Sequence, residues 1–116
     1  MADPCIDLAT FENLRTMMGA DYIGELIDAY FEEAPQLIGQ IEQSLASGNA
    51  EVFRRAAHSL KSSSASFGAL QFSARAKELE MIGKEGNLDG TFEKVANLKE
   101  DYNAVHAALE ALRDGD

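Results

Sequence analysis

The stretch YIGELIDAYFEEAPQLIGQIEQSLA, residues 22–46, decides the fold class of this chain. Its apolar residues return every three or four positions, which is the repeat of a helix with one buried face. The residues expected on that face are Ile23, Ile27, Tyr30, Ala34, Leu37, Ile41 and Leu45. We predict one long helix, capped by Asp21 and kinked at Pro35, because a proline inside a helix removes a backbone hydrogen bond.

The same spacing covers most of the remaining chain. A short helix is expected over residues 8–18, with Asp7 or Thr10 as its N-cap and Gly19 as its stop. Further helices are expected over residues 50–67, 70–84 and 92–112, with Gly48-Asn49 ending one helix and capping the next. The apolar positions of the helix over 70–84 are Phe72, Ala76, Leu79, Met81 and Ile82. These elements predict an all-α fold: an up-and-down antiparallel four-helix bundle with a short extra N-terminal helix.

The composition fits a single folded, soluble domain. The chain has 116 residues, of which 46% are hydrophobic and 26% charged, so it can bury one core. We treat residues 1–116 as one domain with its core over about residues 7–112. Twenty Asp and Glu against ten Lys and Arg give a net charge of −10, which argues against a nucleic-acid partner.

The sequence also bears on location and on metals. Its apolar runs are far shorter than the roughly 20 residues that span a bilayer, and the N-terminus does not resemble an export signal. Cys5 is the lone cysteine, so an internal disulfide is impossible. A Cys/His metal site is excluded because only His58 and His106 could join Cys5. We expect a cytoplasmic protein with no membrane partner.

His58 has the most informative surroundings. The helix over residues 50–67 has a buried stripe formed by Phe53, Ala56, Ala57, Leu60, Ser64 and Phe67. His58 lies about 140° from that stripe, so we expect its imidazole in water. Its neighbours on the helix surface are Arg54, Arg55, Lys61 and Ser62, with Ala65 two turns on.

The residue types around His58 favour a chemical role for its imidazole as a nucleophile. Like-charge repulsion favours the neutral ring, whose free nitrogen is a nucleophile, and the cations would neutralise an attached phosphoryl group. Small side chains at Ser62 and Ala65 leave room for a partner. No carboxylate lies three or four residues from His58, so the backbone, a water or another helix must orient its second nitrogen. From spacing alone, an ordinary solvated helix face is the alternative.

The stretch AAHSLKSSSASFGA, residues 56–69, closely resembles the signature of histidine-containing phosphotransfer (HPt) domains of two-component phosphorelays. The pattern is alanine, histidine, two residues, lysine, a run of small residues, a hydrophobic residue and glycine. The segment FEEAP, residues 31–35, and Gly48-Asn49 also look like the family, so the resemblance covers roughly residues 7–112. Ser62 departs from the pattern, because many members have glycine after the lysine.

The resemblance implies a four-helix bundle whose exposed histidine takes a phosphoryl group from one receiver aspartate and passes it to another. His58 would be the phosphoacceptor, and Lys61 would hold the phosphoryl oxygens. The implied partners are response-regulator receiver domains and a hybrid sensor histidine kinase. The chain would need no cofactor of its own, with Mg²⁺ on the partner receiver, and we expect a monomer.

For several other residues the sequence favours a structural role over a chemical one. His106 lies at the boundary of the last helix's apolar stripe, where packing residues are common. The serines of residues 62–66 lack a base to activate them, and Glu78, Glu80 and Glu85 are expected on solvated faces. Phe31 and Ile38 are candidates for an apolar docking patch beside the third helix, or they simply widen the core face.

Two other function classes are alternatives to a phosphocarrier. A non-catalytic helical adaptor would use the same bundle only to bind a signalling partner. A self-sufficient kinase or hydrolase is disfavoured, because the sequence has no Gly-rich nucleotide loop and no acidic metal cluster.

Overall fold

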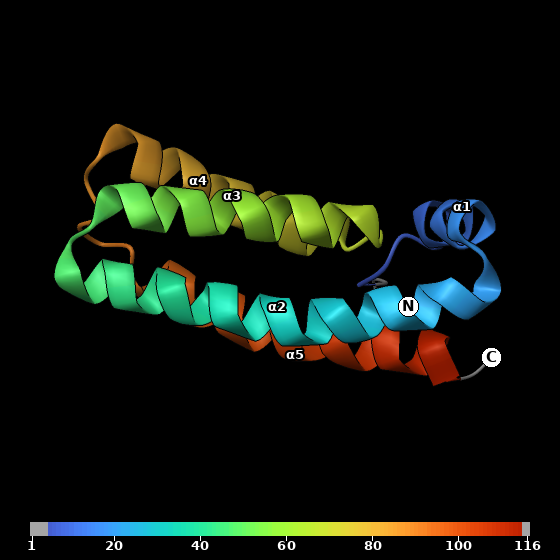
Figure 1. Cartoon of the computed structure of the whole chain (residues 1–116). Helices are drawn as coiled ribbons and strands as arrows, with labels where there is room; N and C mark the ends of the chain where they lie inside the picture. Colours follow the sequence, from blue (N-terminus) through green and yellow to red (C-terminus); the bar gives the residue numbers. More distant parts are fainter. Residues whose placement is uncertain (1–4, 115–116) are drawn as a thin grey trace.

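A computed structural model describes residues 5–114, and every regular element within that range is a helix. The helices, in chain order, are α1 (Leu8–Met18), α2 (Ala20–Ser47), α3 (Ala50–Ser66), α4 (Leu70–Glu85) and α5 (Phe92–Asp114). Helix α2 packs against α3 and α5, and α4 packs against the same two helices. Figure 1 shows these four helices side by side, with α1 at the end where α3 finishes. The all-α prediction is confirmed.

The first helix is fixed at both ends as its sequence predicts. Of the two cap candidates, Asp7 is the N-cap: its Oδ2 accepts hydrogen bonds from the Thr10 backbone N at 3.1 Å and from the Thr10 hydroxyl at 2.5 Å. These bonds hold the pKa of Asp7 below its usual range. Gly19 ends the helix with a φ of 93°, and Phe11 is fully buried.

The start of α2 differs from the prediction. Gly19 occupies the N-cap position, and Asp21 lies inside the first turn, so Asp21 is not the cap. Its carboxylate there still interacts favourably with the helix dipole. The helix continues through Pro35 as far as Ser47. The kink expected at Pro35 stays a prediction.

The buried face of α2 keeps five of the seven predicted residues and differs in the second half of the helix. Ile38 and Ser44 are buried, whereas Leu37 and Leu45 are only half-buried. The difference arises because α2 packs between α3 and α5, so its inward face includes residues on both flanks of the sequence stripe.

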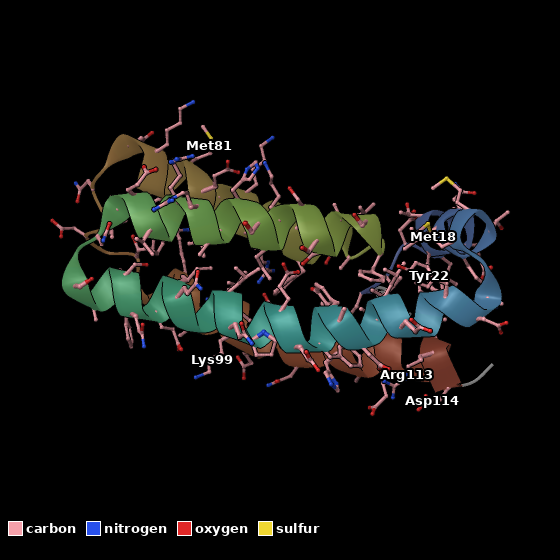
Figure 2. All side chains as sticks on the ribbon, in the orientation of Figure 1. Met18, Tyr22, Met81, Lys99, Arg113 and Asp114 are labelled. Atoms are coloured by element: carbon pink, nitrogen blue, oxygen red, sulfur yellow. The ribbon has the colours of Figure 1, made fainter. Side chains whose placement is uncertain are left out.

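Helices α3 and α4 begin and end close to their expected positions. The side chain of Asn49 caps α3 by accepting a hydrogen bond from the Val52 backbone N at 3.2 Å. Met81 of α4 was expected on the apolar face, but its side chain is 47% exposed and projects from α4 (Figure 2). Its neighbours in sequence, Leu79 and Ile82, carry the packing instead.

Two contacts fix α3 against its neighbours. The hydroxyls of Tyr30 on α2 and Ser64 on α3 share a buried hydrogen bond of 2.7 Å. On the other side, Gly83 of α4 lies against the backbone of Arg54 on α3. Among the described residues, no helix is long and apolar enough to cross a membrane.

Candidate functional site

His58 lies on the outward face of α3, as the sequence predicts. The stripe opposite it is buried, from Phe53 through Ala57 to Ser64, whereas the His58 side chain is 54% exposed. A half-exposed imidazole on a rigid helix is accessible to a partner and held in a defined place.

The residue that orients His58 is Glu80 of α4. Its Oε2 lies 2.8 Å from the Nδ1 atom of His58. This resolves the question that the sequence left open, in favour of a residue from another helix. The expectation that Glu80 lies on a solvated face is wrong, because its side chain is only 16% exposed.

The second oxygen of Glu80 binds Lys61. Lys61 Nζ lies 2.8 Å from Glu80 Oε1, so one carboxylate bridges the two site residues predicted from sequence. The Lys61 hydrogen bond is the main cause of the low pKa of Glu80, and the His58 hydrogen bond lowers it further, while burial acts in the opposite direction. Glu80 is therefore an anion at neutral pH.

The position of Glu80 assigns the roles of the two ring nitrogens. A carboxylate accepts hydrogen bonds, so Nδ1 of the neutral ring must carry the proton and donate a hydrogen bond to Glu80. The lone pair is then on Nε2. The arrangement therefore presents Nε2 as the nucleophilic atom of His58.

The two arginines near His58 are occupied elsewhere. Arg54 binds Glu51 through Nη2 at 2.7 Å and Nε at 3.2 Å, and Arg55 Nε lies 3.6 Å from the same carboxylate. Because both pair with a residue in the first turn of α3, they do not converge on the imidazole. Of the three predicted cations, Lys61 is the one joined to His58, through Glu80.

Two small residues beside His58 leave the imidazole uncovered. Ser62 is exposed, and Ala65 is half-buried. Neither side chain extends far enough to cover an imidazole one or two turns away. The predicted access for a partner is therefore compatible with the structure.

The predicted docking pair is not at this surface. Ile38 is 4% exposed and belongs to the core, so the alternative that it widens the core face holds. Phe31 faces α5, where its ring stacks on His106 with centroids 4.0 Å apart and lies 5.5 Å from the Arg113 guanidinium carbon. The packing role expected for His106 is confirmed by this contact.

A different apolar groove lies beside α3. It is formed where α1, α2 and α3 meet, and its lining includes Leu14, Leu26, Ala29 and Phe67. Ser63 and Ser66 of α3 border it, and the Ser63 hydroxyl donates a hydrogen bond to Glu33 of α2 at 2.9 Å. Sequence patterns do not predict this groove, because its lining residues come from three separate parts of the chain.

Residues 25–115 match the Hpt domain family, and the match includes α3 with His58 and α4 with Glu80. The chain belongs to this family. Within the Hpt family, it is 27% identical over 101 residues to histidine-containing phosphotransfer protein 4 of Arabidopsis thaliana. That alignment covers 85% of this chain and 80% of the Arabidopsis protein.

The fold is shared with a solved Hpt protein. The crystal structure of histidine-containing phosphotransfer protein B (HptB) from Pseudomonas aeruginosa PAO1 superposes with a TM-score of 0.90. The match covers 97% of this chain and 96% of that one at 23% sequence identity. The resemblance found in residues 56–69 is therefore confirmed at the level of family and fold.

Proposed function

We propose that this Hpt domain is a phosphorelay carrier, an antiparallel four-helix bundle with a short N-terminal helix, that receives a phosphoryl group on His58 from a receiver aspartyl phosphate. It then passes the group to the aspartate of another receiver. The observation that carries the proposal is the bridge from His58 Nδ1 through Glu80 to Lys61, with each contact at 2.8 Å. That bridge leaves Nε2 free on an exposed ring.

The transfer step follows from this geometry. Nε2 attacks the phosphorus in line, an N–P bond forms, and the P–O bond to the aspartyl carboxyl breaks, so that the aspartate leaves as a carboxylate. The ring keeps its Nδ1 proton and gains positive charge, which the Glu80 carboxylate stabilises. Passing the group to the next aspartate reverses these bond changes.

Lys61 supports the transferring group. Its ammonium has three N–H donors, so it can keep Glu80 and still donate to a phosphoryl oxygen. The Lys61 side chain is 27% exposed, and it lies one turn from His58 on the same helix. The Mg²⁺ that neutralises further charge in such transfers is expected on the receiver, bound by its carboxylates.

In this proposal the chain is a carrier and not a kinase. Each transfer takes a phosphoryl group that is already activated as an acyl phosphate, so ATP alone should give no labelling. The adaptor is the second candidate: it would bind the same partners through the same helices without holding phosphate.

The test is phosphotransfer from receiver domains of the source organism, phosphorylated with acetyl phosphate. The chain should gain acid-labile, alkali-stable label, and His58→Gln should abolish it. His106→Gln is the matched control, because it removes the only other histidine and should keep the label. Binding of a receiver without any label on the wild-type chain would favour the adaptor, and label persisting in His58→Gln would place the acceptor elsewhere.

A further inference from the structure

The cations of this protein are distributed very unevenly. Helix α2 carries six carboxylates and no Lys or Arg: Asp21, Glu25, Asp28, Glu32, Glu33 and Glu42. Helices α3 and α4 together reverse this balance, with Arg54, Arg55, Lys61, Arg75, Lys77 and Lys84 against Glu51, Glu78, Glu80 and Glu85. In a chain with a net charge of −10, α3 thus carries a net charge of +2 and α4 is balanced, and His58 lies on α3.

Most of the cations are neutralised by a neighbouring carboxylate. Within residues 5–114, every Lys and Arg except two has a carboxylate oxygen within 4.0 Å. The two exceptions are Lys77 and Lys84, both exposed on α4. In a chain with twice as many acids as bases, these two lysines, two turns apart on α4, are the described cations that no carboxylate neutralises within 4.0 Å.

Both lysines flank the residue that holds His58. Lys77 precedes Glu80 by three positions and Lys84 follows it by four, so they lie on its side of α4, one turn away in each direction. Because Glu80 reaches across to α3, this is also the side of α4 next to His58. The two charges therefore lie on either side of the candidate phosphoacceptor along the α4 axis.

An exposed apolar side chain accompanies these charges. Met81 lies four positions after Lys77 and three before Lys84, on the same side of α4, and is 47% exposed. A flexible apolar residue between cationic side chains has the composition of a transient protein interface, with an apolar centre and a charged rim.

We infer that the α4 flank formed by Lys77, Met81 and Lys84 docks an anionic protein surface next to His58. The occupant is the phosphoacceptor region of a receiver domain, so the inference rests on the proposed function. An aspartyl phosphate is itself an anion, and the Mg²⁺ used in its transfer is held by carboxylates, so the face that meets His58 must be rich in negative charge. Lys77 and Lys84 attract that face.

The charge variant is Lys77→Glu combined with Lys84→Glu. Its association with a receiver domain should be about tenfold slower than that of the parent at an ionic strength of ~0.01 M, where the screening length is about 30 Å. At ~1 M, where that length is about 3 Å, the difference should fall below about twofold. Lys77→Arg combined with Lys84→Arg keeps both charges and should keep the rate.

The matched control is Lys94→Glu combined with Lys99→Glu. These lysines lie on α5 and pair with Glu78 and Glu42, and their reversal changes the net charge by the same four units. A control that slows association as much as the α4 variant would assign the effect to net charge and overturn the inference. Equal rates for the parent and the α4 variant at low salt would overturn it too.

Docking is measured separately from chemistry. Each pair of substitutions is placed in a His58→Gln chain, and its association with unphosphorylated receiver domains is followed by stopped-flow fluorescence. Thermal unfolding verifies that every variant is folded. If the wild-type chain takes no phosphate while the lysine-dependent docking persists, the carrier function fails and the docking surface stands. If no receiver binds, both fail.

Discussion

Gly83 of α4 contacts Arg54 of α3 so closely that a Cβ atom on Gly83 would lie 3.0 Å from the N, Cα and Cβ atoms of Arg54. Gly83 comes three residues after Glu80, and Arg54 comes four residues before His58. The close approach is therefore one helical turn from the contact between Glu80 and His58. It sets the spacing between α3 and α4 at which a short carboxylate side chain can reach the imidazole.

Gly83→Ala is expected to destabilise the protein. Overpacking of this kind costs about 1–3 kcal/mol, which outweighs the roughly 0.5–1 kcal/mol that alanine gains over glycine inside a helix. Gly39→Ala in α2 is the matched control, because nothing lies within 4 Å of its added Cβ. Urea unfolding should show opposite signs for the two variants. A stabilised Gly83→Ala chain would contradict the proposed spacing.

Replacing Glu80 should change the tautomer of His58 and the rate of transfer. Glu80→Ala removes the acceptor for the Nδ1 proton, so the transfer rate should fall by about tenfold or more. Glu80→Gln keeps a carbonyl acceptor and should lose less. Rapid quenching gives the rates, and ¹⁵N NMR of the imidazole reports whether Nδ1 keeps its proton. An unchanged tautomer in Glu80→Ala would show that another group orients the ring.

Lys61→Ala should slow transfer while leaving the chain folded. The variant loses a cation beside the transferring phosphoryl group, and we expect a loss of about tenfold. Lys61→Arg keeps a donor and a charge and should recover part of the rate. Lys94→Ala on α5 is the control, because it removes an equal charge from a lysine that pairs with Glu78 and not with Glu80. Equal losses in both variants would indicate a general electrostatic effect.

The ion pair of Glu80 predicts how stability depends on pH. Its pKa in the folded protein is lower than the ordinary 4.5, so the ionised carboxylate stabilises the fold at pH values above that figure. The contribution is lost as pH falls through the lowered pKa. Glu80→Gln should thus lose stability at neutral pH and approach the wild type in acid, as measured by urea unfolding. Glu85→Gln, exposed on the same helix, should show no such convergence.

The buried hydrogen bond between Tyr30 and Ser64 offers a prediction away from the site. Tyr30→Phe leaves the Ser64 hydroxyl unpaired in the core, and the cost should be about 1–2 kcal/mol. Burial is the main reason that the pKa of Tyr30 is raised, so this phenol should stay protonated in alkali that ionises ordinary tyrosines. A double-mutant cycle with Ser64→Ala gives the coupling. No coupling would mean that the two hydroxyls contribute independently.

Local sequence patterns predicted most of the fold. The N-cap at Asp7, the break at Gly48-Asn49 and the exposed face of His58 each depend on residues within a few positions of one another. Caps and helical periodicity are local interactions, so a single sequence contains enough information to place them.

The same local patterns could not predict contacts between residues of different helices. Glu80 is separated from His58 by 22 positions, and nothing on α4 alone marks it as different from Glu78 or Glu85. The assignment of Ile38 to the core or to a docking patch stayed open for a related reason: which side of a helix is covered depends on its neighbours in the fold.

The attachment of α1 bears on where this domain begins. The backbone N of Asp7 donates to the Gly68 carbonyl at 2.7 Å, just past the end of α3, and Gly68 has a φ of +90° there. Phe11 is buried, yet it lies before residue 25, where the family match starts. A fragment cut at residue 25 would lose this anchoring and uncover apolar surface. Excision or fusion of the domain should therefore keep α1 and the buried Ile6 that precedes it.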